Sequence, residues 1–417
     1  MTPRRKQQWG WAFYDWANSA FATTVLAGFF PIFFAKYWAA DLADGERTYW
    51  LGVAGSISSV VVMLMAPLLG GIADRRGLKK RFLLLTTLLG ATSTAGLFFA
   101  AQGDWPLALG LFVLASIAFF AGISFYDSLI VGVATPAEMD RVSALGYGMG
   151  YLGGGLLFAL NVFMFQSPQT FGLEDGSRAI LWSFVMVGVW WLLFSLPLFR
   201  WVPEAPGTAV SSDWGELKAT FREVLRNKPV WMFLLAYWLY IDGVDTVIRM
   251  AVDYGLKLGF EPGALIKALL LVQFIGFPAA IAYGWLADRF GTKTMIYVAL
   301  AAYTAVTCWA YTLTTVSQFY WMAAAIALVQ GGVQSLSRSY YAKLIPADRA
   351  GQFFGFYNML GKFAAVLGPL AVGFTANAFP DNQRLSMLAL LPFFVIGALL
   401  LSQVRPVAAE SPKDARA

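Results

Sequence analysis

The sequence has no histidine and only one cysteine among its 417 residues, and only 13% of those residues are charged. The single cysteine, Cys308, cannot form a disulfide within the chain. The lack of histidine argues against a metal centre and against hydrolysis, because both commonly use imidazole groups. A G-x-x-x-x-G-K-[ST] phosphate loop is also absent from the sequence. We therefore expect no enzyme activity, no metal or other cofactor, and no direct use of ATP.

Hydrophobic residues make up 59% of the chain, so too little polar material remains to cover a water-exposed surface. Apolar runs of about 20 residues, enough to cross a bilayer core, recur between short polar loops. These runs predict an all-α membrane protein with twelve transmembrane helices in two pseudo-symmetric six-helix bundles. The predicted spans are 11–40, 49–73, 82–101, 105–134, 142–165, 179–199, 230–256, 262–287, 292–314, 317–343, 349–379 and 383–404.

The 30 Lys and Arg residues, which give a net charge of +6, are spread over short loops rather than gathered in one patch. This distribution argues against a nucleic-acid partner. If the N-terminus is cytoplasmic, the inner segments carry twenty-one of these residues and the outer segments five. That bias predicts a multi-pass protein of the cell inner membrane with both termini in the cytoplasm.

The longest polar gap divides the chain into an N-terminal bundle, 1–199, a cytoplasmic linker, 200–229, a C-terminal bundle, 230–404, and a cytoplasmic tail, 405–417. Pro203, Pro206 and Gly207 interrupt any helix at the start of the linker. Farther along, apolar side chains at helical spacing predict a short amphipathic helix on the inner membrane surface. These side chains are Trp214, Leu217, Phe221 and Leu225.

Two pairs of similar segments show that the halves are related. GGIADRRGLKK begins at Gly70 and YGWLADRFGTK begins at Tyr283, with Asp74 and Asp288 214 residues apart. PAEMDRVSALGYGM and PADRAGQFFGFYNM begin at Pro136 and Pro346, 210 residues apart. Two pairs at nearly the same offset predict a duplicated architecture, as in many transporters.

The pattern G-x-[LI]-A-D-R-x-G-x-[KR] in the first pair resembles the loop signature of the major facilitator superfamily. The resemblance implies that Asp74 faces the start of the eleventh helix near Arg349, while Asp288 faces Asp140 and Arg141. We expect a charge–dipole latch that closes the cytoplasmic side. The alternative is a basic loop that only sets topology. The expected gate residues are Asp74, Arg75, Gly77, Arg141, Asp288, Arg289, Gly291 and Arg349.

Charged residues inside predicted spans are costly in a bilayer and mark candidate functional positions. Asp242, Asp245 and Arg249 share one face of span 7, either as a solute or proton site or as a self-neutralising ion pair. Lys362 is expected to pair with a carboxylate or an anionic group. The predicted substrate and proton pathway comprises Asp15, Asn18, Asp127, Asp242, Asp245, Arg249, Arg338 and Lys362.

A different role is open to three of these residues. Asp15, Asp127 and Arg338 all lie near the inner ends of their spans. They are therefore also candidates for an inner gate rather than a solute site.

The segments YDWANSAFATT from Tyr14, FYDSLI from Phe125 and LYIDGVDTVIRM from Leu239 are similar to the branch that includes fungal vacuolar amino-acid effluxers and their bacterial homologues. This resemblance implies a monomeric secondary active transporter, embedded in membrane lipids, that moves a small polar solute such as an amino acid by alternating access. Without histidine, we expect protons to be carried by carboxylates. The alternatives are an exporter or flippase of amphiphilic molecules and a non-transporting membrane sensor.

Overall fold

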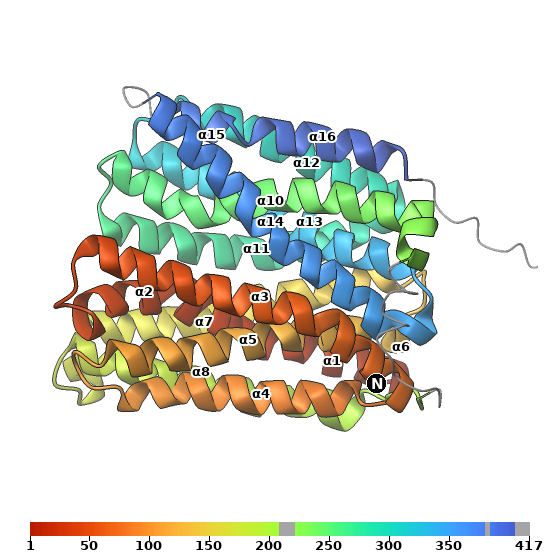
Figure 1. Ribbon diagram of the computed structural model, residues 1–417, viewed down its shortest axis with the longest axis horizontal. Helices are drawn as coiled ribbons and strands as arrows, with labels where there is room; N and C mark the ends of the chain where they lie inside the picture. The colour runs from red at the N-terminus through yellow and green to blue at the C-terminus, as the bar shows by residue number, and fades with distance from the viewer. Residues whose placement is uncertain (208–221, 380–383, 405–417) are drawn as a thin grey trace, which may run out of the picture.

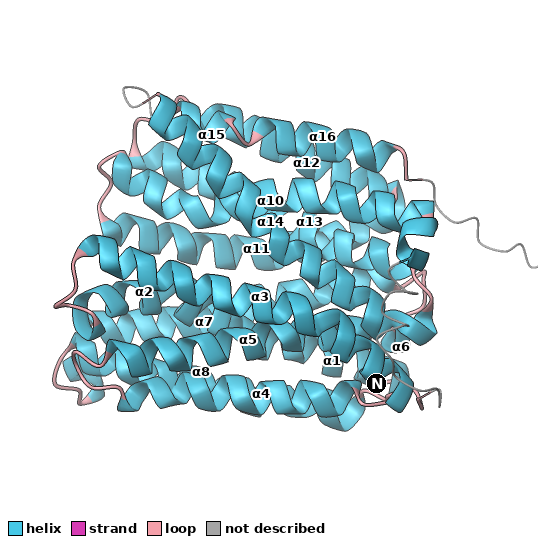
Figure 2. Ribbon diagram, viewed as in Figure 1, coloured by secondary structure: helices cyan, strands magenta, loops and turns pink. Residues whose placement is uncertain are grey.

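The computed structural model describes residues 1–207, 222–379 and 384–404, and within these ranges it contains helices and no strand (Figure 2). Figure 1 shows the first six spans, coloured red to yellow, on one side of the molecule and the last six, green to blue, on the other. Here these are called the first half and the second half. The N-terminus and the end of α16 lie at the same end of the bundle, the terminal end.

All twelve predicted spans are helical. In the first half they are α1 (Pro3–Ala20) with η1 (Phe21–Phe29), α2 (Phe30–Phe33) and η2 (Phe34–Trp38); α3 (Asp44–Arg76); α4 (Lys79–Gly96) with η3 (Leu97–Phe99); α5 (Trp105–Ser128) with α6 (Ile130–Val133); α7 (Met139–Gln166); and α8 (Gly176–Trp201). In the second half they are α10 (Lys228–Lys257), α11 (Pro262–Phe290), α12 (Thr292–Ala310), α13 (Val316–Leu344), α14 (Ala350–Ala378), and α15 (Leu385–Leu388) with α16 (Leu391–Ser402). Short 3-10 turns, η4 (Pro168–Phe171) and η5 (Ala347–Arg349), lie in the loops.

By length and composition, 11 helical segments of the described chain can cross a membrane. The predicted span outside this set is 292–314, where the structure has α12. Its 19 residues include Lys293, four threonines and two tyrosines. It nevertheless packs along α13 and α16 as a full member of the second half.

The first span is not a regular α-helix. After Ala20 it continues as the π-helical segments η1 and η2, and Phe30 N–H donates to Val25 O, five residues back. Pro31 has no N–H to donate to the preceding turn, which favours an altered hydrogen-bond register here. π-Helical turns widen a helix locally and often occur at functional sites. Sequence periodicity did not predict this change.

Glycine lets α3 and α14 approach closely across the two halves. A Cβ atom at Gly355 would lie 2.6 Å from the backbone oxygen of Ala66. Gly77 ends α3 in the left-handed conformation, with φ of 59°, so that the chain turns directly into α4. These positions fix the loop signature of the first half against the second half.

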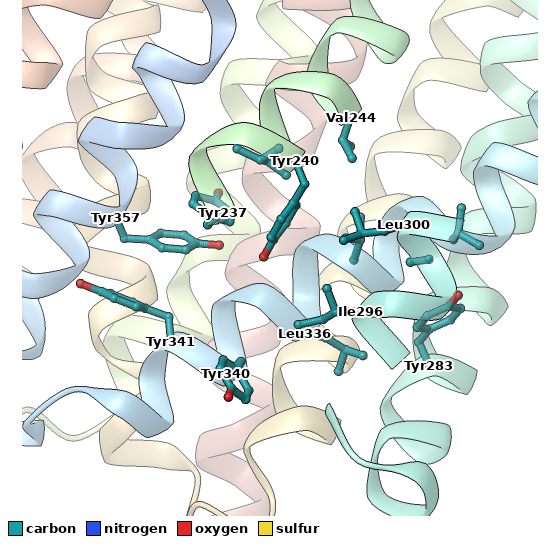
Figure 3. Packing of buried hydrophobic residues seen from close by; sticks show 14 of the residues in the cluster. Tyr237, Tyr240, Val244, Tyr283, Ile296, Leu300, Leu336, Tyr340, Tyr341 and Tyr357 are labelled. Carbon is teal, nitrogen blue, oxygen red and sulfur yellow. The ribbon is translucent and has the colours of Figure 1, made fainter. Parts of the chain in front are cut away.

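Stacked tyrosines join three helices of the second half (Figure 3). Tyr357 of α14 stacks on Tyr237 of α10 with ring centroids 4.1 Å apart and on Tyr341 of α13 at 5.0 Å. Tyr240 of α10 shares a 2.7 Å hydrogen bond with Ser337 of α13. Because Arg338 follows Ser337, this packing also positions the only arginine within α13.

The linker is described only in part. Trp214, Leu217 and Phe221 of its predicted amphipathic helix lie outside the described residues. Residues 222–226 are helical, and Glu223 forms an ion pair with Arg349 at the start of the eleventh span. The division of the chain into domains at the predicted bounds remains a prediction.

Two lysines cap helix ends at equivalent places in the two halves. Lys80 Nζ donates to the carbonyl oxygens of Phe199 and Val202, both at 2.8 Å, at the end of α8. Lys293 Nζ donates to the carbonyl oxygens of Ser402 at 3.1 Å and Val404 at 2.8 Å, at the end of α16. Cations at a helix C-terminus satisfy its unpaired carbonyls and complement its dipole. In each half, the lysine of the repeated signature therefore joins the loop after the second span to the C-terminal end of the sixth span.

We predict that Lys80→Met and Lys293→Met each lower stability by about 1 kcal/mol, because each leaves helix-end carbonyls without their donor. The check is thermal unfolding in detergent, with the exposed Lys36→Met as control. Since the two sites lie in different halves, the effects of the double variant should add. A midpoint unchanged in both single variants would contradict the capping role.

Candidate functional site

A cavity of about 370 Å³ lies between the halves. Its walls come from α1, η1, α5 and α7 of the first half and from α10, α11 and α13 of the second half. It extends from Phe319, near the start of α13, to Arg338, six residues before the end of that helix. Most of the wall is apolar, and the charged groups that line it are gathered at its floor, toward the terminal end.

The floor is an ion triad made of Asp15, Asp127 and Arg338. Arg338 Nη1 lies 3.0 Å from Asp127 Oδ1, and Arg338 Nη2 lies 3.4 Å from Asp15 Oδ2. The Arg338 and Asp127 side chains are only 3% and 4% exposed, and that of Asp15 is 14% exposed. Buried charges of this kind are tolerated only when they are paired and hydrogen-bonded. The triad therefore ties α1 and α5 of one half to α13 of the other.

Aromatic rings surround the guanidinium group. Its carbon lies 4.7 Å from the Trp11 ring, 5.5 Å from Tyr126 and 4.4 Å from Tyr147, all in the first half. Tyr126 Oη also donates to Asp15 Oδ2 at 2.8 Å. These contacts stabilise a cation away from water and fix the orientation of its planar group.

The remaining predicted pathway residues divide into two groups. Asn18 lines the cavity together with the triad, whereas Asp242, Asp245, Arg249 and Lys362 do not line it. Asp245 is near enough to Arg249 and Lys362 for electrostatic interaction. Within the described part of the chain, however, no ion pair of 4.0 Å or less joins it to either cation.

Asp242 and Lys362 have other surroundings. Asp242 is completely buried, and its Oδ1 accepts hydrogen bonds from the Gly368 backbone N–H at 2.9 Å and Thr246 Oγ1 at 3.3 Å. Its Oδ2 has no hydrogen-bond partner among the described residues. Lys362 Nζ lies 2.9 Å from the centroid of the Phe120 ring in the first half. Asp242 therefore joins α10 to α14, and Lys362 lies where α14 packs against α5.

Asp74, the first predicted gate residue, lies against the N-terminal turn of α14. Its two carboxylate oxygens accept the backbone N–H groups of Gly351 at 2.9 Å and Gln352 at 2.7 Å. Lys79 Nζ lies 2.6 Å from Asp74 Oδ1. A carboxylate at a helix N-terminus satisfies unpaired N–H groups and complements the helix dipole. Arg75 and Gly77, two further predicted gate residues, follow Asp74 at the end of α3.

The equivalent contacts of the second half use different partners. Asp288 forms an ion pair with Arg141, while Arg349 pairs with Glu223 of the linker. Gly291 separates α11 from α12 with φ of 89°, and the Arg289 guanidinium lies over the Phe290 ring. All these residues lie at the terminal end, at the loops between helices.

A further polar cluster joins the halves around Asp140. Its carboxylate accepts from Ser339 Oγ at 2.6 Å and Thr292 Oγ1 at 2.7 Å, and it pairs with Lys343 Nζ at 2.6 Å. Ser143 Oγ donates to the Ser335 carbonyl oxygen at 2.7 Å. Together with the Asp74 contacts, this cluster joins the two halves at the terminal end.

Sequence reasoning missed several partners of the site. Tyr126 and Tyr147 flank the triad, Ser143 and Asn358 complete its hydrogen bonds, and Gln273 donates across the cavity wall to Thr23 at 3.0 Å. An aromatic residue does precede both aspartates of the triad, as Tyr14–Asp15 and Tyr126–Asp127. That pattern was available in the sequence, but the serine and asparagine partners carry no comparable signal.

We predict that Asp74→Asn increases the population opened at the terminal end, because an amide cannot accept both N–H groups and cannot pair with Lys79. The measurement is the distance between spin labels on cysteines introduced at the exposed positions Arg200 and Gln403, in a Cys308→Ala background. Asp41→Asn, an exposed carboxylate at the opposite end, is the matched control. An unchanged distance distribution would rule out the latch.

We predict that Arg338→Gln destabilises the protein by about 3–5 kcal/mol, because it leaves buried carboxylates without their cation. Adding Asp127→Asn to this variant should restore part of the loss, since it removes one of the uncompensated charges. Thermal unfolding in detergent measures both effects. A double variant no more stable than Arg338→Gln alone would show that the ion pair is not the dominant contact.

Relatives of the chain are transporters. The family model described as "Vacuole effluxer Atg22 like" matches residues 51–138 and 133–410. An uncharacterised MFS-type transporter, YxiO of Bacillus subtilis, is 36% identical over 96% of this chain and 95% of its own length. Autophagy-related protein 22-1 of Penicillium rubens is 25% identical, over 63% of this chain and 49% of its own length.

Solved structures share the fold. The human organic anion transporter MFSD10 aligns with a TM-score of 0.75 at 16% identity over 96% of this chain and 100% of its own. The proton:xylose symporter XylE aligns with a TM-score of 0.70 at 14% identity over 97% and 95% of the two chains. These alignments confirm the predicted fold class, a multi-pass membrane protein with the major facilitator architecture. The chain belongs to the Atg22-like vacuole effluxer family and is a transporter of the major facilitator superfamily.

Proposed function

We propose that this transporter is a secondary active one that moves a small polar solute through the central cavity by alternating access. The observation that carries the proposal is the ion triad at the cavity floor, where carboxylates of the first half meet the arginine of the second half. A solute or proton that binds there acts directly on the contact between the halves. Rocking of two halves around a midplane site is the usual mechanism of this architecture.

The proposed setting is the inner membrane of a cell, with the terminal end in the cytoplasm, because the inner loops carry most of the Lys and Arg. In this orientation the cavity is closed toward the cytoplasm by the contacts of Asp74 and Asp140. Large apolar side chains such as Phe374 and Leu399 are exposed on the surface, where membrane lipids would contact them. We propose that a single chain, with its two bundles as domains, is the working unit.

Amino acids are the first candidate solutes, because the sequence resembles a branch that includes fungal vacuolar amino-acid effluxers. The size of the cavity, about 370 Å³, suits a small molecule. Its apolar wall, which includes Ile123, Val247 and Met322, favours a second candidate, an exporter or flippase of amphiphilic molecules. The direction of net transport would then be set by the combined gradients of the solute and its coupling ion.

Protons are the proposed coupling ion, and carboxylates are their proposed carriers. Protonation of Asp127 would remove the charge that pairs with Arg338 and so weaken the contact between the halves. Asp242 is a second candidate carrier, because it is completely buried and is joined to the backbone of α14 at Gly368. Protonation of either carboxylate would thus change a contact between helices.

We predict that a solute gradient imposed on liposomes containing the protein moves protons, as recorded by a trapped pH dye. The solute panel comprises amino acids, dipeptides, sugars, organic acids and an amphiphilic dye. Asp127→Asn or Asp242→Asn should abolish proton movement while sparing solute exchange, because exchange needs no change of protonation. Asp41→Asn is the control and should behave as the unaltered chain.

Other outcomes separate the alternatives. Proton-driven transport that survives both substitutions would remove Asp127 and Asp242 as carriers. Flux of the amphiphile alone would select the amphiphile exporter. Solute flux without any proton movement would indicate another coupling ion or facilitated diffusion.

A further inference from the structure

The hydrogen bonds at the cavity floor indicate which chemical group of a solute the site can bind. Among the described residues that line the cavity, the ionisable acids and bases other than tyrosine are Asp15, Asp127 and Arg338. Two carboxylates and one guanidinium leave one negative charge when all are ionised. An excess negative charge in a largely apolar cavity favours a cation.

Arg338 has no donor left for a solute. Its Nε donates to Ser143 Oγ, and Nη2 donates to Ser143 O and Asp15 Oδ2. Nη1 donates to Asp127 Oδ1 and Asp15 Oδ2. A guanidinium has five N–H groups, so all five are engaged. A solute carboxylate therefore finds no free cation among the described residues of the cavity.

One carboxylate oxygen is open. Both oxygens of Asp127 already have a partner, since Oδ1 accepts from Arg338 and Oδ2 accepts from Asn358 Nδ2 at 3.2 Å, and its side chain is only 4% exposed. Asp15 Oδ2 accepts from Tyr126 and Arg338. Asp15 Oδ1 accepts no hydrogen bond from the described residues, and Asp15 lines the cavity with its side chain 14% exposed. Asp15 Oδ1 is therefore the carboxylate oxygen of the triad that has no donor among the described residues, and it is the acceptor best placed for a ligand.

We propose that Asp15 Oδ1 binds the protonated amine of the solute and that a solute carboxylate is not required. The substrate class is small primary amines with an apolar body, including but not restricted to amino acids. The inference rests on the proposed transport function, because it names the substrate class of the same cavity. An ammonium–carboxylate hydrogen bond in a water-poor site is among the stronger polar contacts.

The surroundings of Asp15 suit such a ligand. Asn18 and Ser19, one helical turn along from Asp15, also line the cavity and can accept the remaining N–H groups of an ammonium. Beyond them the wall becomes apolar at Ala22, Ile123 and Met322. An amine that binds at the floor would thus place its apolar body along the wall toward Phe319.

The test is isothermal titration calorimetry on the purified full chain in detergent, at a pH where the ligand amines are protonated. Three leucine derivatives vary one group at a time: leucine has both charges, leucinamide only the amine, and N-acetyl-leucine only the carboxylate. The same three derivatives of phenylalanine vary the apolar body. We expect leucinamide to bind at least as tightly as leucine, and N-acetyl-leucine to bind about tenfold more weakly or worse.

The matched variants are Asp15→Asn and Asp41→Asn. Asp15→Asn should weaken leucinamide binding about tenfold or more, whereas Asp41→Asn should leave it unchanged. If Asp15→Asn does not fold, the comparison of ligands on the unaltered chain decides alone. The proposal would be overturned if the N-acetyl compounds bound more tightly than leucinamide and phenylalaninamide. It would also be overturned if none of the six compounds bound, or if folded Asp15→Asn bound leucinamide as tightly as the unaltered chain.

Failure of this proposal is distinguishable from failure of the proposed transport function. Liposomes that move organic acids or sugars, with no amine binding by calorimetry, would retain the transporter and remove the amine site. Amine binding that depends on Asp15 without flux of any solute would retain the site and count against transport.

Discussion

Arg338 belongs to the second half of the molecule, but its charge is balanced by Asp15 and Asp127 of the first half. A guanidinium at this depth is stable only because two carboxylates and the Ser143 oxygens satisfy all its donors. The cost of separating these charges in a low-dielectric medium opposes any movement that pulls the halves apart. The same contact is the floor of the cavity. A ligand that binds there would therefore affect the ion pairs that hold the halves together.

The contacts at the terminal end form a second layer of contacts between the halves. Asp74 satisfies the first N–H groups of α14, and Asp140 gathers hydroxyl and ammonium groups from α12 and α13. Most of these are helix-end interactions, whose geometry is lost over a displacement of a few ångströms. Small residues let α3 and α14 approach closely enough for them to form. The lining of the cavity along α13 ends at Arg338, and these contacts lie beyond it toward the terminal end.

The cavity combines a polar floor with an apolar wall, and this division has a structural origin. The wall includes the π-helical part of the first span, where Ala22, Thr23 and Ala27 line the cavity. The floor is built from regular helices packed by aromatic rings, which fix the charged side chains in place. A mobile polar group at the floor would lose the geometry that makes a buried ion pair tolerable.

The sequence by itself determined the number of spans, their approximate bounds and the duplicated halves, because hydropathy and repeated loops are local properties of the chain. It also marked Asp15, Asp127 and Arg338, since any charge within an apolar run is conspicuous. Only the tertiary structure decided that these three meet at the cavity, while Asp242, Asp245 and Arg249 do not line it. Helical periodicity places residues on a face but does not say which helix that face contacts. Partners such as Ser143 and Asn358 were invisible for the same reason: a neutral polar residue becomes significant only through the neighbour that the fold brings to it.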